Sequence, residues 1–321
     1  MRSIVRLTWI VLWLFAASVS SAAELPPADA PMEQVIDQFV NDRLAVEKVT
    51  PAPQADDFNL LRRLSLDLAG RIPTPVEAQA FAASTTVTKR VELVDRLLAS
   101  PDFAFHQRNE LDRMLLPEKP NDGDFRKYLL WAVQQGRPWD VMFRDMLTGS
   151  ETDENQKAAL AFVKSRVREL DNLANDTASL FFGVNVSCAK CHDHPLAPDW
   201  KQDHFYGMTL FFSRTYLTKK NLLGEKQLGE VKFSTKKDGQ KQAAFLFLTG
   251  AVINEPVVER SQEQLKELEE VVKKQMKDDD APLPEKPAFS PREKLVEVAL
   301  RPEDNRFFAH NIVNRIWARL L

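Results

Sequence analysis

Apolar residues recur every three or four positions along most of the chain, with charged residues between them. This spacing puts the apolar side chains on one face of an α-helix and is typical of helices that pack against a core. The pattern therefore predicts a molecule built largely from helices. The segments expected to be helical are Val35–Leu44, Leu60–Leu68, Val91–Leu98, Phe103–Leu116, Phe125–Gln135, Trp139–Leu147, Asp171–Phe182 and Lys294–Trp317.

Helix ends are marked by residues that satisfy free backbone groups. Thr74-Pro75-Val76-Glu77 combines a capping hydroxyl, a proline in the first turn and a glutamate three positions after the threonine. This is the pattern of a capping box. Ser290-Pro291-Arg292-Glu293 repeats the same chemistry, and Gly70 stands where a helix is expected to stop.

The stretch from Leu217 to Ile253 has a different pattern. Two apolar runs, Glu230–Phe233 and Ala244–Leu248, flank Lys236-Lys237-Asp238-Gly239. Asp-Gly between apolar runs indicates a β-hairpin. The expected fold class is therefore mainly α, a multi-helix domain with a small β-hairpin element in the C-terminal third.

A charged segment, Gln262–Asp280, carries a narrow apolar stripe of Leu265, Leu268, Val271 and Val272. It predicts a solvated helix, and a partner-binding helix is the other interpretation. A proline-rich loop, Ala281–Pro287, follows it.

The first residues have the pattern of an export signal. Arg2 and Arg6 precede an apolar run, and small residues Ser20-Ser21-Ala22-Ala23 follow it. No later segment is long and apolar enough to span a bilayer, so we expect a periplasmic or secreted protein with no integral membrane span after signal removal. The expected divisions are a signal peptide (1–23), an N-terminal helix and linker (24–56), a helical domain (57–216), a small β element (217–256), a charged helix and linker (257–289) and a C-terminal segment (290–321).

Composition supports this picture and excludes one class of partner. The chain has 10 glycines and 3 tyrosines, which argues against a turn-rich all-β design. Its net charge is −3, and loss of the two leader arginines lowers it to −5. A mildly acidic chain has no overall attraction to nucleic acid, so no nucleic-acid partner is expected.

The two cysteines of the chain stand together in Ser187-Cys188-Ala189-Lys190-Cys191-His192. This is the C-x-x-C-H pattern of c-type haem attachment. On a short helix, positions i, i+3 and i+4 share a face. The sulfurs of Cys188 and Cys191 can therefore bond one haem c covalently while His192 ligates its iron. The preceding helix, Asp171–Phe182, is a candidate wall for a haem pocket or an ordinary core helix.

Two other interpretations of the cysteines remain open. A disulfide is compatible with an oxidising compartment, although the sequence lacks a thioredoxin-like context. Zinc is the better-defined rival, since Cys188, Cys191, either His192 or His194, and His204 would complete a tetrahedral site. Both describe a non-haem secreted structural module stapled at the Cys-His cluster.

The second axial ligand is less well indicated. His194 lies too close to His192 to reach the opposite face of the same iron, so we expect it, with Asp193, to bond a haem propionate or to orient His192. His204 and Met208 are 12 and 16 residues downstream of His192 and are the candidate ligands. Core packing is the other interpretation of Met208. A five-coordinate iron open to a small molecule is also possible.

Other catalytic patterns are missing from the sequence. It contains no G-x-S-x-G, no glycine-rich phosphate loop and no H-E-x-x-H. His106 and His310 are single distant histidines, expected on a helix surface or in the core. Whether the protein is an enzyme is left open.

Several motifs resemble the planctomycete cytochrome-C-associated domain family, also called domain of unknown function fifteen-forty-nine. The resemblance covers roughly residues 57–212. It implies a secreted or periplasmic protein with a haem c and no settled reaction. The chain departs from the family at His204, where members commonly carry Asp or Tyr, and at Met208, where they carry another apolar residue. The matching motifs are Phe58–Thr74, Val94–Pro101, Phe182-Gly183-Val184, and Cys191-His192-Asp193-His194-Pro195 with Trp200, Tyr206-Gly207 and Phe211-Phe212.

The segment Asp304–Trp317 is similar to the start of a companion domain, of unknown function fifteen-fifty-three. On this resemblance the chain contains the opening of a truncated companion domain. The function expected is an exported haem-c protein that transfers electrons in the periplasm, with a periplasmic redox partner or a companion-domain protein as its partner.

Overall fold

The computed structural model describes residues 26–27, 29–119, 122–195, 197, 199–235 and 238–320. The chain forms two compact units, Met1–Asp56 and Asp57–Leu321. The proposed signal peptide, residues 1–23, lies outside the described residues.

The first unit contains one described helix, α1 (Met32–Glu47). It begins after Pro31 and ends at Lys48, whose φ of 54° is left-handed and stops the helix. The predicted helix at 35–44 is therefore present, although none of its residues is buried.

The second unit begins with a small helical bundle. Its core consists of Leu61, Ala69, Phe81, Leu93 and Leu97. The helices are α2 (Asp57–Leu64), a π-helical turn η1 (Ser65–Ala69), α3 (Pro75–Ala83), α4 (Lys89–Leu98) and α5 (Pro101–Leu115). Gly70 ends η1 with a φ of 68°. The His106 ring lies where a Cβ at this position would stand, so both the backbone angle and the space favour glycine.

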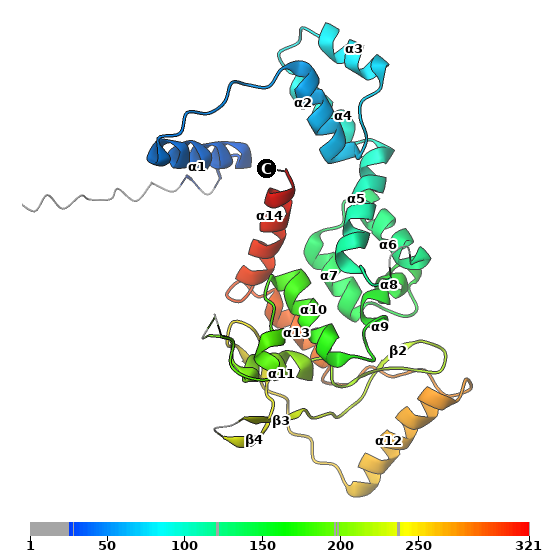
Figure 1. Cartoon of the computed structure of the whole chain (residues 1–321). Helices are drawn as coiled ribbons and strands as arrows, with labels where there is room; N and C mark the ends of the chain where they lie inside the picture. The colour runs from blue at the N-terminus through cyan, green and yellow to red at the C-terminus, as the bar shows by residue number, and fades with distance from the viewer. Residues whose placement is uncertain are drawn as a thin grey trace, which may run out of the picture. The chain divides into compact units, whose positions relative to one another are not determined.

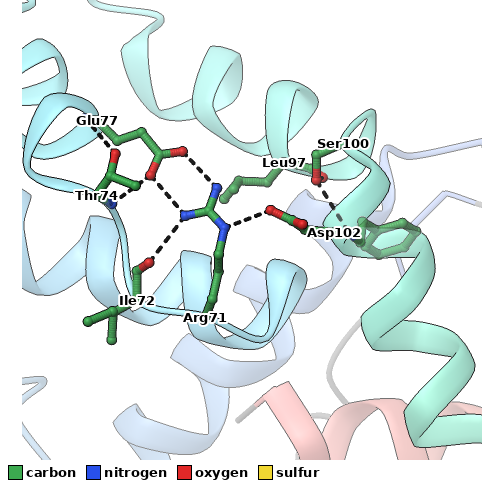
Figure 2. A network of polar contacts seen from close by, with 8 residues as sticks. Arg71, Ile72, Thr74, Glu77, Leu97, Ser100 and Asp102 are labelled. Atoms are coloured by element: carbon green, nitrogen blue, oxygen red, sulfur yellow. Dashed lines mark hydrogen bonds and ion pairs between the residues drawn. The ribbon is translucent and has the colours of Figure 1, made fainter.

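Arg71 joins the starts of two helices of this bundle (Figure 2). Its guanidinium donates two 2.9 Å bonds to the Glu77 carboxylate and a 2.6 Å bond to Asp102 at the start of α5. Glu77 also accepts from Thr74 N, while Thr74 Oγ1 accepts from Glu77 N. The predicted capping box at Thr74 is thus confirmed, and Arg71 ties it to α5.

The main core lies in the helices that follow. They are α6 (Gly123–Gln134), α7 (Trp139–Thr148), α8 (Glu154–Ala159), α9 (Ala161–Lys164), α10 (Leu170–Phe182), a short 3₁₀ turn η2 (Ser187–Lys190) and α11 (Gln202–Leu210). Buried aromatic rings dominate their packing, and Phe143 contacts Phe181 with ring centroids 4.7 Å apart. The helix predicted at Asp171–Phe182 is α10.

Three antiparallel strand pairs follow within the described residues: β1 (Thr215–Leu217) with β2 (Leu223–Glu225), β3 (Lys232–Thr235) with β4 (Gly239–Gln242), and β5 (Phe245–Leu246) with β6 (Val252–Ile253). The fold class is therefore mainly α with small β elements in the C-terminal third, as predicted.

The predicted hairpin is correct in place but wrong in one strand. β3 pairs with the polar strand β4, Thr235 opposite Gly239, and not with the apolar run Ala244–Leu248. That run contains β5, which pairs with β6, and Phe247 and Leu248 are buried in the main core. The residues of Ala244–Leu248 are apolar because this segment contributes to the core. The strand that pairs with β3 is instead set by the tight turn that directly follows β3.

The chain ends in three helices, α12 (Gln262–Lys277), α13 (Pro291–Ala299) and α14 (Arg306–Leu320) (Figure 1). Ser290 caps α13 by accepting a hydrogen bond from Glu293 N. α14 packs against α10, where Asn311 Nδ2 donates to Leu180 O at 2.7 Å. None of the helices in the described ranges is both long enough and apolar enough to cross a membrane.

Candidate functional site

Both cysteines lie on the turn between α10 and α11. They are free thiols, and both are exposed to solvent. Cys188 lies within η2 and Cys191 caps its C-terminal end with helical backbone angles. In a 3₁₀ helix, positions i and i+3 lie on the same side. The turn therefore presents the two sulfurs on one side. The sequence predicts that Cys188, Cys191 and His192 share the face of one short helix, whereas η2 ends at Lys190 and His192 follows it.

The turn is anchored at its base by buried apolar residues. Val186 and Ala189 are fully buried in the main core, and Ala189 N donates to Val186 O at 2.9 Å. At the start of the turn, the Asn185 side chain accepts hydrogen bonds from both Ser187 N and Ser187 Oγ. Because buried and exposed residues alternate, Val186 and Ala189 fix the turn to the core while both thiols face the solvent.

Two side chains of α11 brace the turn from the other side. Gln202 Nε2 and Tyr206 Oη each donate a 3.1 Å hydrogen bond to Lys190 O, the carbonyl between the two cysteines. The backbone N of Gln202 also donates to Asp193 Oδ1 at 3.2 Å. The sequence did not predict the hydrogen bonds of Gln202 and Tyr206 to Lys190 O. The residue pattern of a helix carries no signal for a hydrogen bond to a carbonyl 12 or 16 residues earlier in the chain.

His192 is exposed beside the thiols and has a defined orientation. Its Nδ1 lies 2.7 Å from the backbone oxygen of Asp193. A carbonyl can only accept, so Nδ1 carries a proton, and in the neutral imidazole the lone pair is on Nε2. Ligating histidines commonly donate their other ring N–H in this way. Two exposed thiols followed by an imidazole with a free Nε2 form a donor set that fits a haem c.

Lys190, the charged residue of η2, is paired with an acid on α10. Lys190 Nζ lies 2.7 Å from Asp171 Oδ2 on α10, and this hydrogen bond raises the pKa of Lys190. The Tyr206 ring stacks on Phe233 of β3 with centroids 4.3 Å apart. Burial, and then the negative charge of Asp171, raise the pKa of Tyr206, so its hydroxyl stays protonated and able to donate.

His194 and His204 lie near the site but serve the loop that follows it. The backbone N of His194 donates to Trp200 O at 2.8 Å. His204 Nδ1 accepts from Lys201 N at 3.2 Å at the start of α11, and its ring meets Trp200 edge-on. Burial lowers the pKa of His204, which keeps the ring neutral. In this arrangement His204 caps α11, and its proton lies on Nε2.

Met208 differs from the thiols in its exposure to solvent. Its side chain is fully buried in the main core on α11, whereas Cys188, Cys191 and His192 are exposed. Next to it, Gly207 lies directly against the backbone of Leu246, so this side of α11 is closely packed. The structure therefore places Met208 as a core residue.

The cysteines and histidines are not gathered into a compact metal cluster. Within the described ranges, no group of three or more Cys, His, Asp or Glu side chains takes up an arrangement that could hold a metal ion. His106 is half-buried beside Gly70, and His310 is exposed on α14.

A comparison with protein families identifies the matched region. The family model described as "Protein of unknown function (DUF1549)", with the short name PSCyt2, matches residues 35–216. The chain belongs to this family. No curated protein and no solved structure matches the chain.

The DUF1549 match includes the whole candidate turn and its brace. It runs through η2, with both cysteines, and through α11, with Gln202 and Tyr206. Phe233, which stacks on Tyr206, and the helices α12, α13 and α14 lie beyond it. The similarity of Asp304–Trp317 to a companion domain stays a prediction.

Proposed function

We propose that this DUF1549 protein covalently holds one haem c and transfers electrons outside the inner membrane. The observation that carries the proposal is the exposed turn with two free thiols, next to an imidazole whose Nδ1 donates to Asp193 O and whose Nε2 is free. The export pattern at residues 1–23 supports the compartment, since c-type attachment needs an exported chain.

Each residue of the site has a separate task in this proposal. Cys188 and Cys191 would hold the haem through their sulfurs, by addition of each S–H across one vinyl group with the hydrogen going to carbon. His192 Nε2 would hold the iron, and Asp193 O fixes the His192 ring. Gln202 and Tyr206 hold the turn between the sulfurs. A bound haem c supplies a one-electron redox centre.

Met208 would not hold the iron in this proposal. Met208 is fully buried, and withdrawing it would open a cavity in the core. His204 Nδ1 is occupied by the bond from Lys201 N. In this proposal neither Met208 nor His204 would hold the iron, so added carbon monoxide should bind and shift the ferrous spectrum of the haem-loaded protein.

The test is expression of the full chain in a host with haem-c maturation machinery. The expected result is a pyridine haemochrome spectrum of c type and, after denaturation and acid extraction, an intact mass increased by one haem. Cys188→Ala with Cys191→Ala should abolish covalent haem. His310→Ala, which changes an exposed histidine on α14, is the matched control and should retain it.

The contrary results are equally specific. A protein that keeps the mass of the bare processed chain in a competent host ends the haem proposal. Stoichiometric zinc in metal analysis would assign the cluster to a structural zinc module. A mass two hydrogens lower, restored by reductant, would assign it to a disulfide.

A further inference from the structure

Helix α14 contacts the chain on both sides of the candidate site. It packs against α10, the helix that leads into η2 (Figure 1). Asn311 Nδ2 donates to Leu180 O at 2.7 Å, and Asn311 Oδ1 lies 2.9 Å from where a Cβ at Gly183, the last residue of this helix end, would stand. Phe307, one turn earlier on α14, contacts Trp200 beyond the cysteines, with ring centroids 5.7 Å apart. One helix therefore contacts the segments before and after the Cys-His motif.

These contacts of α14 lie along one face of the helix. Phe307, Asn311 and Arg315 are spaced by four residues, so their side chains project on the same side. Arg315 Nη2 donates to Ser179 O, also on α10, at 3.1 Å. Phe308, the residue after Phe307, is buried in the main core. The start of α14 is thus fixed to the core, and the Phe307 ring has a defined place.

Trp200 is the residue through which α14 reaches the candidate site. Its side chain is half-buried and packs against the main core, and its ring contacts the rings of Phe307 and His204. Its backbone oxygen accepts a hydrogen bond from His194 N at 2.8 Å. A displacement of Trp200 would therefore remove the partner of the His194 amide.

The peptide unit between Asp193 and His194 carries the group that orients His192. Asp193 O lies 2.7 Å from His192 Nδ1. A peptide unit is planar, and its N–H and C=O point in opposite directions. The hydrogen bond from His194 N to Trp200 O therefore also fixes the direction of the Asp193 carbonyl. On the same residue, Asp193 Oδ1 accepts from Gln202 N at 3.2 Å.

We infer that Phe307 is a positioning residue for His192 and acts through Trp200. The Phe307 ring holds Trp200, and Trp200 O fixes the peptide unit whose carbonyl orients the imidazole. The value of this orientation for iron binding rests on the proposed function, whereas the orientation itself does not require haem. Because α14 lies beyond residues 35–216, a segment outside the DUF1549 match then contributes to the candidate site.

The tautomer of His192 in the full, reduced chain without haem tests this role. Nitrogen-15 NMR at about pH 8, where an ordinary imidazole is neutral, distinguishes a protonated Nδ1 from a protonated Nε2. The wild type should hold an excess of the Nδ1–H form. Phe307→Ala should lower the ratio of the Nδ1–H to the Nε2–H form by about fivefold, which corresponds to the loss of one ordinary hydrogen bond. Exchange of the His194 amide should become faster by a similar factor.

Three further variants on α14 complete the design. Phe307→Tyr keeps a ring against Trp200 and should keep the wild-type ratio. Trp317→Ala, which removes an exposed aromatic side chain from the same helix, is the matched control and should also keep it. Phe307→Leu retains more apolar volume and should lower the ratio by a smaller amount, so it serves as the test if circular dichroism shows that Phe307→Ala is unfolded.

Two results overturn the positioning role. The first is a ratio unchanged in a folded Phe307→Ala protein that is less stable in urea, which would mean that the ring only stabilises the fold. The second is a wild type without an excess of the Nδ1–H form. Both are measured without haem, so an absence of covalent haem ends the proposed function alone, and an unchanged ratio ends the role of Phe307 alone.

Discussion

Two carbonyl oxygens organise the candidate site at the scale of single residues. The oxygen of Lys190 accepts from Gln202 and Tyr206, and the oxygen of Asp193 accepts from the His192 ring. The first fixes the turn that carries the thiols, and the second fixes the tautomer of the imidazole. The functional groups are thus positioned by backbone atoms, whose partners are not visible in the motif itself.

Removal of the Tyr206 hydroxyl tests the brace. Tyr206→Phe keeps the ring on Phe233 but loses one hydrogen bond to Lys190 O. It should lower the free energy of unfolding by about 1 kcal/mol, measured by urea denaturation. Tyr206→Ala, which also loses the stacked ring, should cost more. A Tyr206→Phe protein as stable as wild type would show that water replaces the bond without loss.

Met208 provides a test that separates core packing from iron ligation. Because its side chain is fully buried, Met208→Ala should lower the free energy of unfolding by about 2–5 kcal/mol, whereas Met208→Leu should cost less than about 1.5 kcal/mol. Denaturant unfolding measures both. In haem-loaded protein, Met208→Leu should leave the ferrous spectrum unchanged. A spectrum that changes with Met208→Leu would make Met208 a ligand.

At the scale of elements, Arg71 connects the starts of the helices α3 and α5. The residue follows the left-handed Gly70, so the chain turns back at this point and brings the guanidinium to Glu77 and Asp102. The first turns of α3 and α5 are thereby held together (Figure 2). The Gly-Arg-Ile-Pro-Thr motif of the resemblance is therefore structural in this protein.

The Arg71 contact predicts a pH dependence. Hydrogen bonds from Arg71, and then from Thr74 N, lower the pKa of Glu77 from 4.5 to about 2. Ionised Glu77 therefore stabilises the fold above pH 4.5, and this contribution is lost as the pH falls toward about 2. Because the pair is partly exposed, Glu77→Gln should cost about 1 kcal/mol at pH 7.

The measurement is urea unfolding of wild type and Glu77→Gln between pH 7 and pH 2.5. The difference between the two proteins should shrink as the pH is lowered. Glu267→Gln, an exposed glutamate on α12, should show no such difference at any pH. A difference that is constant across the range would mean that the charge of Glu77 does not contribute.

At the scale of the second unit, α14 joins the small bundle to the main core. Phe308 packs among the rings of Trp139, Phe143 and Phe182 in the main core. At the other end of the helix, Arg319 donates to Asp67 O and to Gln107 Oε1, both at 3.0 Å, in the small bundle. His106 lies beside this contact, and burial, followed by the charge of Arg319, lowers its pKa. The last helix therefore couples two cores that have no residue in common.

Arg319→Ala should loosen this coupling. Loss of about 1 kcal/mol of docking energy corresponds to roughly fivefold faster amide exchange. The increase should be concentrated in η1 and the middle of α5, which carry the partners Asp67 and Gln107, and hydrogen exchange with mass spectrometry measures it. Arg315→Ala is the matched control on the same helix, because Arg315 donates to Ser179 O on α10 and should affect that helix instead. Uniformly faster exchange in both variants would contradict separate docking roles.

The sequence by itself determined the helical class, the position of most helices, the caps at Thr74 and Ser290, and the Cys-His motif. These features are local: periodicity, capping and motif spacing involve residues within one or two turns of one another. The turn residues in the C-terminal third also predicted the position of the β element.

Tertiary structure decided which of the candidates share a surface. Met208 and His204 are near His192 in sequence, but core packing buries Met208 and the start of α11 uses the Nδ1 of His204. The pairing of β3 with β4, and the brace from Gln202 and Tyr206, also depend on contacts between separate elements. The hydrophobic pattern of a sequence predicts which residues are buried, because burial depends on the chemistry of each side chain. It does not predict which residues they contact, because those contacts depend on the path of the whole chain.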